Sequence, residues 1–187
     1  MPSARTLLLT TLTMLAFAGN SVLCRIALRE TGIDAASFTT IRLASGAVVL
    51  WLIVRGFRRA QVGGGSWISA LMLFAYAAGF SFAYLSLTTA TGALLLFGAV
   101  QATMICWGLW RGERFGAWQL VGLALAVGGL VGLLLPGLSA PPLGGAALML
   151  MAGAAWGVYS IRGKGAGDAT RVTAGNFLRA VPFAVAL

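Results

Sequence analysis

Charged residues are scarce in this chain, and acidic residues are the scarcest of all. Aspartate and glutamate together number 4 of 187 residues, against 13 lysines and arginines, and histidine is absent. Soluble domains carry about 25% charged residues, whereas this chain has 9% charged and 59% hydrophobic residues. A soluble domain of this length could not bury so much apolar surface away from water. The composition therefore excludes a soluble globular domain and favours an integral membrane protein.

The chain also lacks the side chains from which metal and catalytic sites are built. Its two cysteines, Cys24 and Cys106, lie in different apolar stretches with no CxxC spacing. Without histidine or a cysteine–carboxylate cluster there are no ligands for a metal, and we expect no cofactor. No GxSxG or HExxH motif is present, and no acidic pair lies within an apolar stretch. We therefore expect no enzymatic activity.

What the chain does contain is a series of seven apolar stretches. Each is close to the roughly 20 residues that a helix needs to cross a bilayer. They cover residues 7–24, 35–54, 67–87, 92–110, 117–135, 143–161 and 172–187. The connections are short, so neighbouring helices are predicted to pack antiparallel. The sequence thus predicts an all-α, multi-pass membrane protein. A cleaved leader ending near Ala18 is a rival interpretation of the first stretch.

The basic residues predict the orientation, because cytoplasmic loops are enriched in lysine and arginine. With a cytoplasmic N-terminus, the outer loops hold only Arg25 and Arg29. The inner segments then hold Arg5, Arg55, Arg58, Arg59, Arg111, Arg114, Arg162, Lys164 and Arg171. Most tryptophans fall near the same inner ends. This topology accounts for the net charge of +9, so we expect no nucleic-acid partner.

The end of the chain begins to repeat its start. Gly19 precedes Arg42 by 23 positions, and Gly157 precedes Arg179 by 22. Residues 7–135 are predicted to form a first five-helix repeat, and residues 143–187 the start of a second. Because five is odd, the second repeat would enter the membrane from the opposite face. The two repeats would then be inverted, as in many secondary transporters.

On these residues the chain resembles the EamA-type branch of the drug/metabolite transporter superfamily. The motifs that carry the resemblance are Phe17-Ala18-Gly19-Asn20, Phe38-x-x-x-Arg42, Gly112-Glu113-Arg114, Gln119-Leu120-Val121-Gly122, Gly128-Gly129, Ala155-Trp156-Gly157 and Asn176-Phe177-x-Arg179. The resemblance implies ten helices in two inverted repeats, both termini inside, and transport of small metabolites across a bacterial inner membrane. Many relatives carry a proline in helix four, which this chain does not. Seven of ten helices are predicted, so we expect a truncated form.

Polar and aromatic residues at membrane depth are the candidates for a substrate pathway. Arginine within a span costs a few kcal/mol or more unless it faces protein, water or substrate. The amides could bind a polar solute or bridge helices, and the aromatic residues, Tyr76 among them, could form cavity walls or ordinary packing. The substrate-pathway candidates are Asn20, Arg42, Tyr84, Gln101, Trp156, Tyr159, Asn176 and Arg179. The candidates for close helix packing or hinges are Gly19, Gly128, Gly132, Gly153 and Gly157.

The leading hypothesis is an inner-membrane carrier, most simply an exporter, that moves small polar metabolites by alternating access. Its expected partners are the lipid bilayer and a small-molecule substrate, with a homodimer as a further option. No carboxylate lies within a span, so proton coupling through this part of the chain is not expected. The alternative is a non-transporting membrane protein, either a truncated product or an assembly partner. A membrane enzyme has no motif to support it.

Overall fold

Helices form all the regular secondary structure in the described part of the chain. The computed structural model describes residues 4–57, 64–134 and 141–187. The helices are α1 (Ala4–Glu30), α2 (Ala35–Leu52), the π-helix η1 (Ile53–Phe57), α3 (Trp67–Ala83), α4 (Thr89–Trp110), α5 (Ala117–Leu134), α6 (Leu143–Gly163) and α7 (Ala169–Val185). Each predicted apolar stretch corresponds to one α-helix, so the all-helical architecture is confirmed. The inverted repeat stays a prediction.

Length and composition separate these helices into two groups. Within the described residues, α1, α4, α6 and the continuous helix Ala35–Gly56 are long and apolar enough to cross a membrane. The apolar helix α3 is shorter, as is the apolar segment Ala117–Gly129 of α5. The last helix, α7, has 17 residues and carries Pro182 inside it. The described part of the chain therefore contains four candidate membrane spans by these criteria.

Polar residues fix where several helices begin. The side chains of Asp34, Ser66 and Thr88 accept hydrogen bonds from backbone N–H groups in the first turns of α2, α3 and α4. Hydrogen bonding to Ser37 lowers the pKa of the Asp34 carboxyl. Asp168 caps α7 in the same way. The prediction started this helix at residue 172, too late, because an apolar pattern does not detect the polar first turn that Asp168 stabilises.

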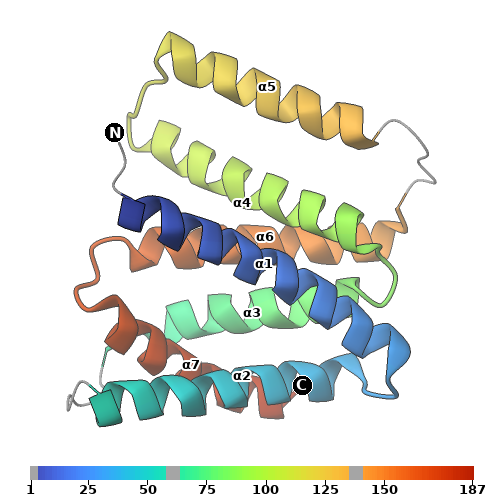
Figure 1. Cartoon of the computed structure of the whole chain (residues 1–187), viewed down its shortest axis with the longest axis vertical. Helices are drawn as coiled ribbons and strands as arrows, with labels where there is room; N and C mark the ends of the chain where they lie inside the picture. The colour runs from blue at the N-terminus through green and yellow to red at the C-terminus, as the bar shows by residue number, and fades with distance from the viewer. Residues whose placement is uncertain (1–3, 58–63, 135–140) are drawn as a thin grey trace.

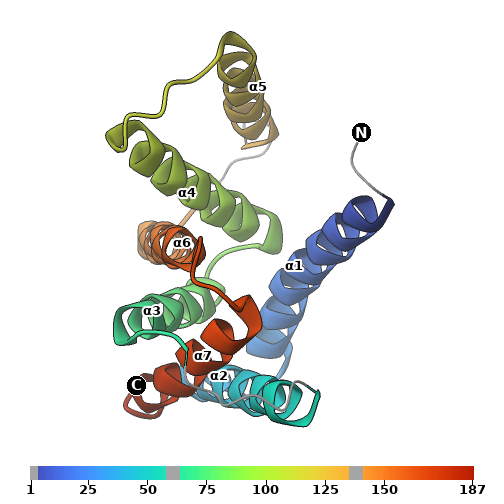
Figure 2. The ribbon, with the colours of Figure 1, turned by 90° about the vertical axis from the view of Figure 1, so that its left-hand side faces the viewer.

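The helices form a stack around α6. Successive helices run back and forth across Figure 1, so α1 and α6 point in opposite directions. α6 packs against α3 and α4, while α7 packs against α2 and α3. α1 crosses the front of the stack, and α5 stands apart from it (Figures 1 and 2). Between Ala117 and Gly129 every residue of α5 is exposed except Leu123, which is half-buried.

The interior is built from small residues and a few aromatic rings. Ala70, Ala83 and Ala180 are fully buried, together with the larger Phe80 and Tyr84. Large apolar side chains instead point outward, above all along the first half of α1. This distribution is expected of helices in lipid, where small residues allow close packing and the outer surface is apolar.

The glycines proposed for close packing have different surroundings. A side chain at Gly153 or Gly157 would collide with α4, so these two glycines allow α4 and α6 to approach closely. Around Gly19 and Gly128, by contrast, a Cβ atom would meet nothing within 4 Å. The helix α1 runs without a break through Gly19. The side-chain surroundings of Gly132 lie outside the described residues.

Gly112 ends α4 in a Schellman turn and supports the first stability prediction. Its φ is +86°, its N–H donates to Leu109 O at 2.9 Å, and Glu113 N–H donates to Gly108 O at 2.9 Å. Because a Cβ atom strains this left-handed conformation, Gly112→Ala should lower the free energy of unfolding by about 1 kcal/mol. Thermal unfolding in mild detergent measures this. Gly32→Ala is the control, since Gly32 has open surroundings and no positive φ; equal effects at both sites would contradict the prediction.

Candidate functional site

A cavity of about 710 Å³ lies between helices from the two ends of the chain. Its volume falls in the range of about 300–1,000 Å³ that small-molecule sites occupy. α1, α2 and α3 supply most of its walls, α6 and α7 supply one residue each, and α4 supplies none. The lining residues are Leu9, Leu12, Thr13, Ala16, Phe17, Asn20, Arg42, Leu43, Ser45, Gly46, Val49, Leu73, Tyr76, Ala77, Trp156 and Phe177.

Helical spacing explains how α1 and α2 build these walls. Residues three, four and seven positions apart share one face of a helix. On α2, this spacing brings Arg42, Ser45, Gly46 and Val49 to the cavity. On α1, it brings Leu9, Thr13, Ala16 and Asn20 to the same space. Three of the predicted pathway residues, Asn20, Arg42 and Trp156, therefore meet at one cavity.

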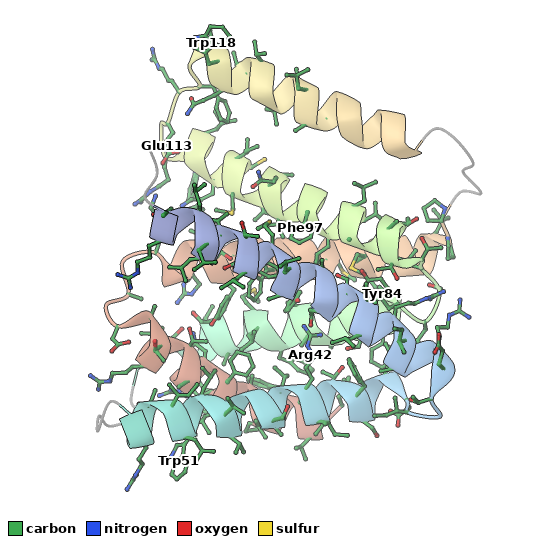
Figure 3. All side chains as sticks on the ribbon, in the orientation of Figure 1. Arg42, Trp51, Tyr84, Phe97, Glu113 and Trp118 are labelled. Carbon is green, nitrogen blue, oxygen red and sulfur yellow. The ribbon has the colours of Figure 1, made fainter. Side chains whose placement is uncertain are left out.

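Arg42 lies in the middle of the bundle (Figure 3), where its guanidinium group lies over the rings of Phe80 and Tyr76. Its Nη2 donates a hydrogen bond to the Tyr76 hydroxyl at 3.0 Å. Its guanidinium carbon lies 4.9 Å from the centre of the Phe80 ring and 5.2 Å from that of Tyr76, a cation–π arrangement. Its Nη1 is buried and has no hydrogen-bond partner within the described ranges. The guanidinium is thus oriented by aromatic contacts, with donor capacity left unused.

A series of aromatic contacts connects this arginine to α7. The ring centroids of Tyr76 and Trp156 are 4.7 Å apart, and Trp156 stacks on Tyr159 at 5.3 Å. The Tyr159 hydroxyl accepts a hydrogen bond from Asn176 Nδ2 at 3.4 Å. Tyr159 and Asn176 do not line the cavity, but they support the Trp156 ring that does.

The segment before α3 is fastened to α7 by polar contacts. Asn176 Oδ1 accepts a hydrogen bond from Ser66 N–H at 2.9 Å. Arg179 Nη1 donates to Gly64 O at 2.8 Å and to Gly175 O at 3.0 Å. The two arginines predicted within spans therefore differ, because Arg179 is bonded to backbone carbonyls and lies outside the cavity.

Besides Tyr159, Asn176 and Arg179, two further predicted pathway residues lie outside the cavity, Tyr84 and Gln101. Tyr84 is fully buried at the end of α3, where its carbonyl accepts a hydrogen bond from Arg25 Nη1 at 2.6 Å. Its hydroxyl donates to Thr89 O at 3.3 Å. Figure 3 shows Tyr84 near the turn between α3 and α4, away from Arg42. Gln101 is exposed on α4 and lines no part of the cavity.

Sequence reasoning did not single out Phe17, Ser45 or Phe177 as wall residues. Ser45 could have been found, because it lies three positions after Arg42 and thus on the same helix face. Phe17 lies three positions before Asn20 in the same way. Phe177 carries no such signal, since its position depends on how α7 packs against α2.

In the described part of the chain, the lining of the cavity is mostly apolar, and Arg42 is its one charged side chain. No group of three or more His, Cys, Asp or Glu side chains there could hold a metal ion. All four carboxylates lie at helix ends or in loops, and none lines the cavity. The arrangement can hold a small molecule against apolar walls and beside one guanidinium group.

Comparison with known proteins adds two relatives. The chain is 60% identical over 188 residues to Uncharacterized protein PA1977 of Pseudomonas aeruginosa, a match that covers 100% of this chain and 66% of that protein. It is 32% identical over 170 residues to an uncharacterized transporter of Archaeoglobus fulgidus, covering 86% of this chain and 58% of the relative. No family model matches, and no solved structure matches.

The chain therefore spans about two thirds or less of the length of these relatives. It is similar over most of its own length to a protein named as a transporter, and its helices have the character of membrane spans. These findings indicate a membrane protein related to transporters.

Proposed function

We propose that this chain forms the greater part of a membrane carrier that moves small molecules by alternating access. The observation that carries the proposal is the cavity of about 710 Å³, whose walls come from α1, α2 and α3 on one side and from α6 and α7 on the other. A cavity shared between two ends of a chain can open to either side of a membrane when those ends rock against each other.

The details of the proposal follow from the sequence. The carrier is of the EamA type within the drug/metabolite transporter superfamily, built from inverted five-helix repeats. It lies in a bacterial inner membrane with a cytoplasmic N-terminus, and it exports its substrate. Trp51 and Trp118 support this orientation, because tryptophan is enriched at membrane–water interfaces. Figure 3 shows both at the same end of the bundle as Glu113. Arg58 and Arg59, which also support this orientation, lie outside the described residues.

Cysteine accessibility tests the proposal directly. In a background with Cys24→Ala and Cys106→Ala, Asn20→Cys would place one thiol in the cavity. A membrane-impermeant maleimide is then applied to right-side-out and to inside-out vesicles. We expect labelling from both sides, because a carrier exposes its cavity alternately. A cavity thiol that reacts from one side alone would contradict transport and favour the non-transporting alternative.

Two loop positions serve as matched controls for the sidedness of the vesicles. Gly32→Cys lies between α1 and α2, and Lys164→Cys lies between α6 and α7. We expect Gly32→Cys to react only from the periplasmic side and Lys164→Cys only from the cytoplasmic side. The reverse pattern would overturn the proposed orientation while leaving the transport test intact.

A further inference from the structure

We infer that the cavity binds a small organic carboxylate with an apolar, flat body, and that it selects this anion over zwitterions and cations through Arg42. The inference rests on the proposed carrier function and names its substrate class. It depends on three features of the cavity: an arginine with unused donors, the lack of a fixed negative charge, and aromatic walls.

The first feature is the state of Arg42. A guanidinium has five N–H donors, and the described protein groups accept a hydrogen bond from one of them, at the Tyr76 hydroxyl. Nη1 is buried without an acceptor among the described residues, which is unfavourable for a charged donor. Arg179 provides the internal comparison, because carbonyl oxygens accept both of its short hydrogen bonds. Arg42 is therefore the arginine whose charge a bound anion would balance.

The second feature is the charge of the cavity as a whole. Its other lining side chains with polar atoms are neutral; they belong to Thr13, Asn20, Ser45, Tyr76 and Trp156. The Thr13 hydroxyl donates to Leu9 O at 2.7 Å, and the Ser45 hydroxyl donates to Arg42 O at 3.2 Å. An ammonium group entering this space would meet no carboxylate and would be repelled by Arg42. A carboxylate, by contrast, matches the planar fork of a guanidinium.

The third feature is the aromatic part of the cavity wall. The rings of Phe17 and Trp156 meet edge to face at 6.2 Å, and Tyr76 continues the surface at 4.7 Å from Trp156. Flat apolar groups pack well against such rings. The polar end of a ligand would thus lie at Arg42 and its apolar body against Phe17 and Trp156.

The test is a binding measurement on the purified chain in neutral detergent, with four probes of similar shape. Phenylacetate carries the anion, phenylacetamide is its neutral counterpart, phenylalanine is a zwitterion and phenethylamine is a cation. By calorimetry we expect phenylacetate to bind at least tenfold more tightly than each of the others. Equal binding of the four probes, or a preference for phenylalanine, would overturn the inference without any variant being needed.

Two variants locate the charge that selects the anion. Arg42→Gln should remove the preference for phenylacetate over phenylacetamide, whereas Arg42→Lys should keep part of it. Arg179→Gln is the matched control and should change phenylacetate affinity less than twofold. Equal losses in Arg42→Gln and Arg179→Gln would overturn the assignment. Thermal unfolding of each variant, measured beside binding, separates loss of the site from loss of the fold.

This experiment and the labelling experiment fail independently. Anion-selective binding through Arg42, combined with a cavity thiol that reacts from one side only, would support the binding site and reject the carrier. Labelling from both sides, combined with binding that ignores ligand charge, would support the carrier and reject the carboxylate.

Discussion

Gly153→Ala is expected to disrupt the packing of α6 against α4. A Cβ atom at Gly153 would lie 2.6 Å from the backbone carbonyl oxygen of Leu96 and 2.6 Å from the Ala99 Cβ. Neither atom belongs to a flexible side chain, so α4 and α6 must move apart. Overpacking of this kind costs about 1–3 kcal/mol, and here it also separates both helices along their shared face.

Gly144→Ala on the same helix is the matched control. Nothing lies within 4 Å of a Cβ atom at Gly144, and alanine favours an exposed helix position by up to about 1 kcal/mol over glycine. The same substitution should therefore lower the thermal unfolding midpoint at residue 153 and leave it unchanged or raised at residue 144. A Gly153→Ala midpoint equal to that of the parent chain would show that α4 and α6 are not packed this closely.

Much of the fold could be predicted from the sequence, because each helix corresponds to a run of apolar residues. Runs of apolar residues near the length of a bilayer span predicted all seven helices. Residues such as Asp34 and Ser66 cap the helices where the predicted stretches begin. Arg42 and Trp156 could be placed at the cavity because both are costly or unusual at that depth unless they face protein.

The orientation of other residues could not be predicted, for a physical reason. In a soluble helix, apolar residues mark the buried face, but in a membrane helix lipid accepts apolar side chains on every face. Gln101 and Asn20 are both amides within apolar runs, yet Asn20 lines the cavity while Gln101 is exposed. Nothing near them in the sequence distinguishes the two. The position of Tyr84 could not be predicted either, because its place beside the turn after α3 depends on its tertiary contact with Arg25.

The polar attachment of residues 64–66 to α7 gives the prediction with the largest expected effect. A Cβ atom at Gly175 would overlap the carbonyl oxygen of Gly64, and it would also lie 2.9 Å from Arg179 Nη1. Gly175→Ala should therefore displace the Gly64–Ser66 segment and break both bonds that hold it, from Arg179 and to Asn176. We expect a loss of about 3 kcal/mol, in the upper range for a single substitution.

Hydrogen exchange measured by mass spectrometry shows both where this effect occurs and how large it is. The Ser66 N–H donates to Asn176 Oδ1 at 2.9 Å, so its exchange should accelerate in Gly175→Ala together with the first turn of α3. Arg179→Gln removes the hydrogen bond to Gly64 O without the steric overlap and should cause a smaller acceleration in the same peptide. Gly163→Ala, with nothing within 4 Å, is the neutral control. Unchanged protection of Ser66 in Gly175→Ala would refute the attachment, and with it the account of Arg179 as a structural residue. That account matters for the cavity, because it is what leaves Arg42 as the arginine available to an anionic ligand.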